Sequence, residues 1–279
     1  MRIAIVAPST PIDRDVADRV TALAGETHPG AELHFHEQCF HSHNHFAGED
    51  RQRLEALVQA ANDPSFDAIW FARGGYGSCR IAEAALARFG EAAHAKTWLG
   101  YSDAGYLLAG LYANGIGTVA HGPMPQDIKR EGGEAAVLRA LAWLTGRNPA
   151  SLEPSLDHRP AAAFNIMVLS QLLGTPLQPD LAGHVLMLEE VSEYMYRTDR
   201  SMFHITGNPA IRRVAGIRLG RCSLVPANDP DFGATEEEVV RFWCERAGIP
   251  FLGRADIGHD AANRVVPFGR ARESATNAL

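Results

Sequence analysis

Hydrophobic positions in the first half of the chain recur as short apolar runs, each followed by an amphipathic segment. The run RIAIVAP at residues 2–8 is rich in β-branched residues and ends in proline and serine, which predicts a buried strand leading into a loop. Residues 13–25 follow with apolar side chains at helical spacing. The same order of strand, loop and helix returns at residues 67–86 and 96–115. Repeated units of this kind predict a parallel sheet with helices on both faces.

The pattern changes after residue 146. Residues 147–163 are rich in proline, serine and charge and have no regular period, which predicts a linker between a first domain at 1–146 and a second at 164–279. We expect residues 271–279 to be loosely ordered. The second half reads as a smaller α/β domain, with helices predicted at 165–175, 196–205 and 235–248 and strands at 184–190 and 214–220.

Composition narrows the class of protein. The 279 residues are 46% hydrophobic, so a large core can be buried, and the net charge is -7 with no basic block, which argues against nucleic acid as the main partner. No apolar run approaches the roughly 18 residues of a membrane helix, and the first run is too short for a signal peptide, so we expect a cytoplasmic protein with no membrane partner. Four dispersed cysteines indicate neither a zinc knuckle nor a disulfide framework.

A serine lies at one predicted junction of strand and helix, in WLGYSDAG at residues 98–105. Ligands of parallel α/β sheets bind at the carboxyl ends of strands, and a helix start offers N–H groups that suit an oxyanion. Serine is also a favoured N-cap residue, and no G-x-S-x-G motif surrounds Ser102. The local sequence therefore leaves two alternatives for Ser102, a nucleophile or a helix cap.

A glycine-rich segment, FARGGYGSCR at residues 71–80, follows another predicted strand. Its glycines would let backbone N–H groups approach a ligand closely. The spacing matches neither the G-x-G-x-x-G nor the Walker pattern, so a functional loop and a simple tight turn both remain open.

The segment LHFHEQCFHSHNHF at residues 33–46 invites a metal interpretation. Two of its histidines alternate with apolar residues, as on the solvent side of a strand, and the others fall in a predicted loop. We therefore expect no metal site there. The histidines are His34, His36, His41, His43 and His45.

Two residues in the second half complete a possible catalytic set. Glu189 ends the apolar strand VLMLEE, and His259 follows a short strand and Gly258. A lone glutamate at a strand end is usually solvated, and a lone histidine is usually structural. Together with Ser102, however, they supply a nucleophile, a carboxylate and a base in the chain order Ser, Glu, His.

With these residues in place, the chain resembles the LD-carboxypeptidase family of serine peptidases, which also contains the microcin C immunity peptidases. The resemblance rests on ordered segments that cover nearly the whole chain. They are IAIVAPS, FAGEDRQR (46–53), DAIWFARGGYGSCRI (67–81), WLGYSDAGYLL (98–108), HGPM (121–124), LLGTPLQPDLAGHVLMLEEVSEYMYRTDR (172–200) and IGHDAANRVVPFG (257–269).

The resemblance implies an N-terminal Rossmann-like or flavodoxin-like domain and a smaller C-terminal α/β domain, with the active site at their interface. It implies Ser102 as nucleophile, Glu189 as carboxylate and His259 as base. The implied reaction releases terminal D-alanine from a muropeptide tetrapeptide by cleaving an L,D-peptide bond in cytoplasmic cell-wall recycling. Neither metal nor cofactor is implied, and a homodimer is expected.

The resemblance also implies an oxyanion hole formed by the N–H groups of Asp103 and Gly75, with Gly74, Tyr76 and Asn165 in the substrate site. One departure concerns the pocket. The family pattern has glycines where this chain has Ala163 and Phe164, and we expect the phenylalanine to narrow the pocket.

Two further functions stay open at this stage. The nearest is a peptidase of the microcin immunity kind, which would cleave an acyl-aspartate nucleotide conjugate. The other is a non-catalytic protein that holds a carboxylate or phosphate at the glycine-rich loop and the helix start beside it.

Overall fold

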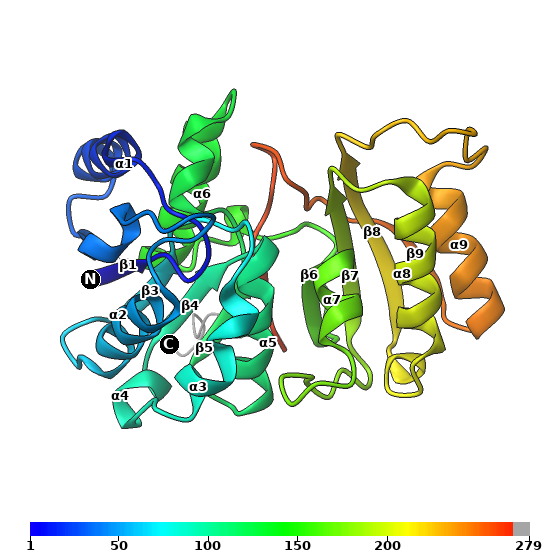
Figure 1. The fold of residues 1–279 in the computed structure, drawn as a ribbon, viewed down its shortest axis with the longest axis horizontal. Helices are drawn as coiled ribbons and strands as arrows, with labels where there is room; N and C mark the ends of the chain where they lie inside the picture. The colour runs from blue at the N-terminus through cyan, green and yellow to red at the C-terminus, as the bar shows by residue number, and fades with distance from the viewer. Residues whose placement is uncertain (270–279) are drawn as a thin grey trace, which may run out of the picture.

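The computed structural model describes residues 1–269, which form two sheets with helices packed against them (Figure 1). The tail prediction for residues 271–279 lies outside the described residues. The first sheet has the strand order β10-β5-β4-β3-β1-β2 and is parallel except for β10. Its strands are β1 (Arg2–Val6), β2 (Glu32–Phe35), β3 (Ala68–Phe71), β4 (Thr97–Gly100), β5 (Thr118–His121) and β10 (Val266–Pro267).

Helices cover both faces of this sheet, as the repeated units predicted. Alternate side chains of β1 and β3 pack with α1 and α6 on one face and with α2, α3 and α5 on the other. The helices are α1 (Arg14–Thr27), α2 (Asp50–Asn62), α3 (Ala82–Leu86), α4 (Glu91–His94), α5 (Gly105–Ala113) and α6 (Gly133–Gly146), with short 3-10 turns η1 (Glu37–Phe40), η2 (Ser78–Arg80), η3 (Ser102–Ala104), η4 (Pro125–Lys129) and η5 (Pro149–Ser151).

The second sheet is parallel, in the order β6-β7-β8-β9. One face is covered by helices, and the other by the segment that follows β9. The last helix begins with the capping pair Thr235 and Glu238, each of which binds the other's backbone N–H. The elements are β6 (Ala161–Asn165), α7 (Ile166–Leu172), β7 (Val185–Val191), α8 (Met195–Gly207), η6 (Ile211–Arg213), β8 (Gly216–Ser223), α9 (Glu236–Ala247) and β9 (Phe251–Arg254).

The end of the described chain returns to the first sheet. Strand β10 pairs antiparallel with β5, through Val266 opposite His121 and Pro267 opposite Ala120. On the way, Val265 forms a bridge with Leu152 of the segment predicted to be a linker, and β6 begins within that segment. The sheets are therefore joined more closely than the predicted boundaries at 146 and 164 imply. Strand β10 has only two residues, and β6 begins with alanines. Both features give weak sequence signals for a strand.

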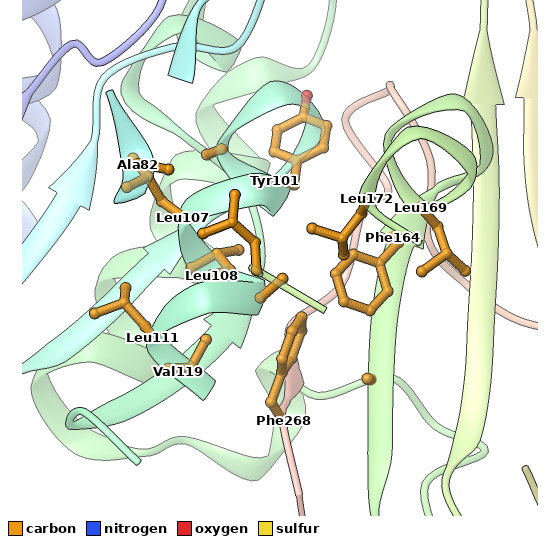
Figure 2. Packing of buried hydrophobic residues seen from close by; sticks show 14 of the residues in the cluster. Ala82, Tyr101, Leu107, Leu108, Leu111, Val119, Phe164, Leu169, Leu172 and Phe268 are labelled. Carbon is orange, nitrogen blue, oxygen red and sulfur yellow. The ribbon is translucent and has the colours of Figure 1, made fainter. Parts of the chain in front are cut away.

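The expectation that Phe164 narrows the substrate pocket is wrong. Its side chain is 1% exposed and belongs to the hydrophobic core that runs between the two sheets. The ring meets that of Phe268 edge to face at 5.1 Å, and Figure 2 shows it beside Leu172 and Phe268. Gly105 of α5 lies on the other side, where an added Cβ would be 3.6 Å from the Phe164 ring. Phe164 thus joins the domains.

None of the helices within residues 1–269 is both long and apolar enough to cross a membrane.

We predict that Phe164→Ala destabilises the whole molecule, because the deleted ring lies in the core shared by both sheets. The expected loss is about 3–5 kcal/mol of unfolding free energy, in a single cooperative transition. Urea unfolding followed by circular dichroism measures it. The matched control is Phe203→Ala, since Phe203 is 58% exposed and should cost much less. A second transition, or equal losses in the two variants, would contradict a shared core.

Candidate active site

Ser102 lies in a sharp turn directly after β4. Its φ is +60°, a left-handed conformation that residues other than glycine rarely adopt. The residue caps neither helix that follows, because the N-cap of η3 is Tyr101 and that of α5 is Ala104. The helix-cap alternative is therefore wrong, and the turn leaves the hydroxyl free for other contacts.

The structure brings Ser102, His259 and Glu189 together although they come from three distant segments. His259 Nε2 lies 2.9 Å from Ser102 Oγ, and His259 Nδ1 lies 2.5 Å from Glu189 Oε2. Glu189 is fully buried and His259 is 8% exposed. The arrangement has the geometry of a hydroxyl, an imidazole and an orienting carboxylate in series.

The environment of His259 favours its charged form. Burial alone would lower the pKa of His259, but the charge of Glu189 and the hydrogen bond to it outweigh burial and raise that pKa above its ordinary value. The carboxylate also defines the tautomer, because Nδ1 must carry a proton to donate to it. In the neutral ring Nε2 is then an acceptor for the Ser102 hydroxyl.

A set of buried polar residues holds the His259 loop, and sequence reasoning missed it. Asn263 is fully buried, and its side-chain oxygen accepts from the N–H of Gly258 at 3.2 Å and contacts Nε2 of His121 at 3.2 Å. Burial lowers the pKa of His121 to about 4, so this ring is neutral. The Tyr101 ring packs 4.8 Å from the His259 ring, and its hydroxyl donates to Asp127.

The Asp103 side chain has a structural role in addition to the oxyanion role predicted for its backbone N–H. Its buried carboxylate accepts from the N–H of Ser78 at 2.8 Å and from the hydroxyl of Ser9. It thereby ties together the loops that follow β1, β3 and β4. Burial raises the pKa of Asp103, although the hydrogen bonds from Ser9 and Ser78 act in the opposite direction. In the sequence, the place of Asp103 directly after a candidate nucleophile is its one signal, and it does not reveal these partners.

The glycine-rich loop lies directly against Ser102. A Cβ at Gly74 would sit 2.8 Å from Ser102 Oγ and 3.6 Å from the backbone nitrogen of Asp103, so this position admits no side chain. Gly75 has φ +106°, and the Gly74 carbonyl accepts from the Thr10 hydroxyl at 2.7 Å. Within residues 1–269 the N–H of Gly75 has no acceptor. The loop is thus shaped for close approach to a ligand.

Tyr76 is 49% exposed and extends the glycine-rich loop toward the histidine-rich segment. Its ring lies 6.1 Å from that of Phe46 and 6.3 Å from that of His45. Among residues 1–269, no group of three or more histidine, cysteine, aspartate or glutamate side chains is arranged to hold a metal ion. The aromatic contact is therefore the observed link between the histidine-rich segment and the site.

The Asn165 side chain forms hydrogen bonds within the protein. Its side-chain oxygen caps α7 by accepting from the N–H of Val168 at 3.1 Å, and its amide donates to Glu190 at 2.6 Å. Glu190 also accepts from the N–H groups of Met167 and Val191, both at 2.9 Å. The adjacent glutamates of β7 thus point to different partners, Glu189 to His259 and Glu190 to the start of α7.

Comparison with known proteins identifies the class. The model of the LD-carboxypeptidase N-terminal domain matches residues 3–122, and that of the C-terminal domain matches residues 162–273. The chain belongs to the LD-carboxypeptidase family and is a hydrolase of the carboxypeptidase type.

Particular relatives agree with this assignment. The chain is 28% identical over 286 residues to the murein tetrapeptide carboxypeptidase of Pseudomonas aeruginosa, which covers 96% of this chain and 91% of the relative. Its fold matches a muramoyltetrapeptide carboxypeptidase from Oxalobacter formigenes with a TM-score of 0.79 and 22% identity, over 95% and 93% of the two chains. It also matches the microcin C7 self immunity protein MccF in complex with aspartyl sulfamoyl adenosine, with a TM-score of 0.76 and 18% identity over 98% and 97%.

We predict that Glu190 makes stability depend on pH. Burial raises the pKa of Glu190 to about 7 from an ordinary value of 4.5. Because the folded pKa is the higher one, its contribution to stability is present below the unfolded pKa and is lost as the pH rises to about 7, a change of about 3 kcal/mol.

The variant Glu190→Gln should remove that slope. Its unfolding free energy should fall less than that of the unmodified protein between about pH 5 and about pH 8. Urea unfolding across this range measures the difference, with Glu245→Gln at an exposed position of α9 as the control. Parallel pH curves for all three proteins would contradict a raised pKa at Glu190.

Proposed function

We propose that this protein is a serine carboxypeptidase that hydrolyses an L,D-peptide bond and releases terminal D-alanine from a muropeptide tetrapeptide. The observation that carries the proposal is the series of contacts from Ser102 through His259 to Glu189, within a chain of the LD-carboxypeptidase family. The name of the Pseudomonas relative supports the tetrapeptide substrate. We assign the reaction to cytoplasmic recycling of cell-wall peptides.

In the proposed mechanism, His259 removes the proton from the Ser102 hydroxyl as its oxygen attacks the peptide carbonyl. Glu189 holds the ring in the tautomer whose Nε2 accepts that proton, and it stabilises the imidazolium that forms. The imidazolium then protonates the leaving amine of D-alanine. Water, activated by the same histidine, hydrolyses the acyl-enzyme and restores Ser102. These steps use side chains and water alone.

The carbonyl oxygen gains negative charge during the attack and needs donors already in place. We assign this role to the N–H groups of Asp103 and Gly75. The close approach of Gly74 to Ser102 supports the assignment, as does the N–H of Gly75, which has no acceptor within residues 1–269. The buried Asp103 carboxylate acts as a positioning group, because it binds the loop that carries the glycines to the turn that carries the nucleophile.

A second candidate substrate is an acyl-aspartate nucleotide conjugate. The observation that favours it is the fold match to MccF, which was solved with aspartyl sulfamoyl adenosine. Ser102 would attack the carbonyl of that conjugate, with His259 and Glu189 in the same roles. The two candidates are separated by testing both substrates on one preparation.

We predict that Ser102→Ala abolishes release of D-alanine from a muropeptide tetrapeptide. The rate should fall on the order of 10⁴- to 10⁶-fold, because no other group supplies the nucleophile. Chromatography of released D-alanine measures the rate, and circular dichroism verifies the fold. Unchanged turnover would exclude Ser102 as nucleophile. Tight binding by the unmodified protein with no product from either candidate substrate would instead indicate a binding protein.

We predict that activity rises with pH through an apparent pKa above ~6.5, the ordinary value for histidine. The base acts only when neutral, and Glu189 raises the pKa of His259. In Glu189→Gln the negative charge beside His259 is gone while the burial of His259 remains, so the pKa of His259 should fall. The acid limb of the pH profile should therefore move to lower pH, and kcat should also fall. A kcat/KM profile of both proteins measures this. An acid limb at the same pH in both would contradict the role given to Glu189.

A further inference from the structure

The His259 loop, residues 255–265, joins β9 of the second sheet to β10 of the first. In Figure 1 this loop, drawn in orange and red, lies between α6 and the second sheet. His259 contacts Glu189 of the second domain and Ser102 of the first at the same time. The position of the base therefore depends on how the loop is attached to each domain.

One arginine attaches the loop to the first domain. Arg139 is a half-buried residue of α6, and its Nη1 donates to the backbone carbonyls of Ala261 at 3.0 Å and Asn263 at 2.8 Å. The start of the same helix also approaches the loop, since a Cβ at Gly132 would lie 3.4 Å from the Cβ of Ala261. Hydrogen bonds from a charged donor are about twice as strong as neutral ones, so Arg139 holds the loop to the domain that carries Ser102.

A second arginine attaches the loop to the second domain. Arg221 of β8 forms ion pairs with Asp260, which follows the base directly, and with Asp256 at 2.5 Å. Its neighbour Gly220 lies against Glu189, because a Cβ at Gly220 would be 2.9 Å from the Cβ of Glu189. The ion pair of Arg221 with Asp260 therefore fixes the loop relative to the carboxylate that orients the base.

We infer that these two arginines are positioning residues with separate tasks. Arg139 sets the distance from His259 to Ser102. Arg221 sets the contact between His259 and Glu189. The inference rests on the serine carboxypeptidase function proposed above, and both guanidinium groups act on the reaction through His259. A misplacement of about one ångström can cost on the order of 100-fold in rate, which is the scale of effect expected.

The pKa of His259 reports on one of the two contacts. Burial lowers this pKa, and the charge of Glu189 and the hydrogen bond to it raise it. Apart from the loop and β8, the ionisable groups that face the ring within residues 1–269 come from the first domain, and neither arginine forms a hydrogen bond with them. They are Tyr101, His121, Asp127 and Arg130. A change in the pKa of His259 therefore indicates a change in its contact with Glu189, which is the contact assigned to Arg221.

The first test replaces Arg139. Arg139→Met should lower kcat for D-alanine release about 10- to 100-fold, while KM is kept and the acid limb does not move to lower pH, because the contact of His259 with Glu189 persists. Arg139→Lys should restore much of kcat, since an ammonium can donate to both carbonyls. The matched control is Arg88→Met, because Arg88 is an arginine of the first domain that pairs with Glu55 on the surface, and it should leave kcat unchanged. Arg139→Gln has the same expected result and is used if Arg139→Met does not fold.

The second test removes the ion pair at β8 as a unit. The double variant Arg221→Met, Asp260→Asn loses one positive and one negative charge, so the net charge beside the base is unchanged. A weaker contact with Glu189 should lower the pKa of His259, because burial then meets less opposition. The acid limb of the kcat/KM profile should move to lower pH, and kcat should fall. Arg221→Lys keeps the charge without the planar fork, and it should give a smaller shift in the same direction.

Two results would overturn the inference: an acid limb that moves equally in Arg139→Met and the double variant, or a kcat in Arg139→Met equal to that of the Arg88→Met control. Circular dichroism verifies that each variant is folded. Failure of the proposed function is distinguishable, because then the unmodified protein releases no D-alanine. NMR titration of the His259 ring decides in that case. A lower pKa in the double variant alone supports separate tasks, and the same pKa in all proteins or the same shift in both variants overturns them.

Discussion

The contact between Ser102 and His259 is the constraint on which the rest of the structure depends, because it joins residues carried by different sheets across 2.9 Å. A relative shift of one ångström between the sheets would break a hydrogen bond of this length. The continuous core around Phe164 and Phe268 resists such a shift. Packing far from the reacting atoms thus sets the geometry of the proposed catalysis.

Burial of the Glu189 carboxylate costs free energy, and this cost strengthens its contact with His259. The carboxylate is fully buried, and its Oε1 has no hydrogen-bond partner within residues 1–269, so its charge is compensated mainly through His259. An unpaired buried charge is strongly unfavourable, which binds the histidine firmly to the carboxylate. Next to it, Glu190 accepts two hydrogen bonds at the start of α7, from Asn165 and Met167, and a third from the N–H of Val191 in its own strand. Two adjacent identical residues therefore serve different purposes because a strand presents them to opposite sides.

Much of the fold was predictable, because repeated strand and helix patterns determine a parallel sheet with covered faces. Ser102 and His259 each follow a predicted strand and Glu189 ends one, and the resemblance to the LD-carboxypeptidase family singled these three residues out as a candidate triad. The direction of Phe164 could not be predicted, since both faces of β6 are buried and its apolar run shows no alternation. The contacts of Asn263 with His121 and of the Asp103 carboxylate with Ser78 were missed because these partners lie far away in the chain.

Strand β10, near the end of the described chain, pairs with β5 and so adds residues of the second domain to the sheet of the first. Neither half is therefore a self-contained module that could be exchanged for that of a relative by a single crossover in the gene. A recombinant joined at residue 160 would pair a foreign β10 with the resident β5, and both the edge of the first sheet and the loop bearing His259 would have to match. Such a chain is expected to diversify through its surface loops, with its two halves inherited as one unit.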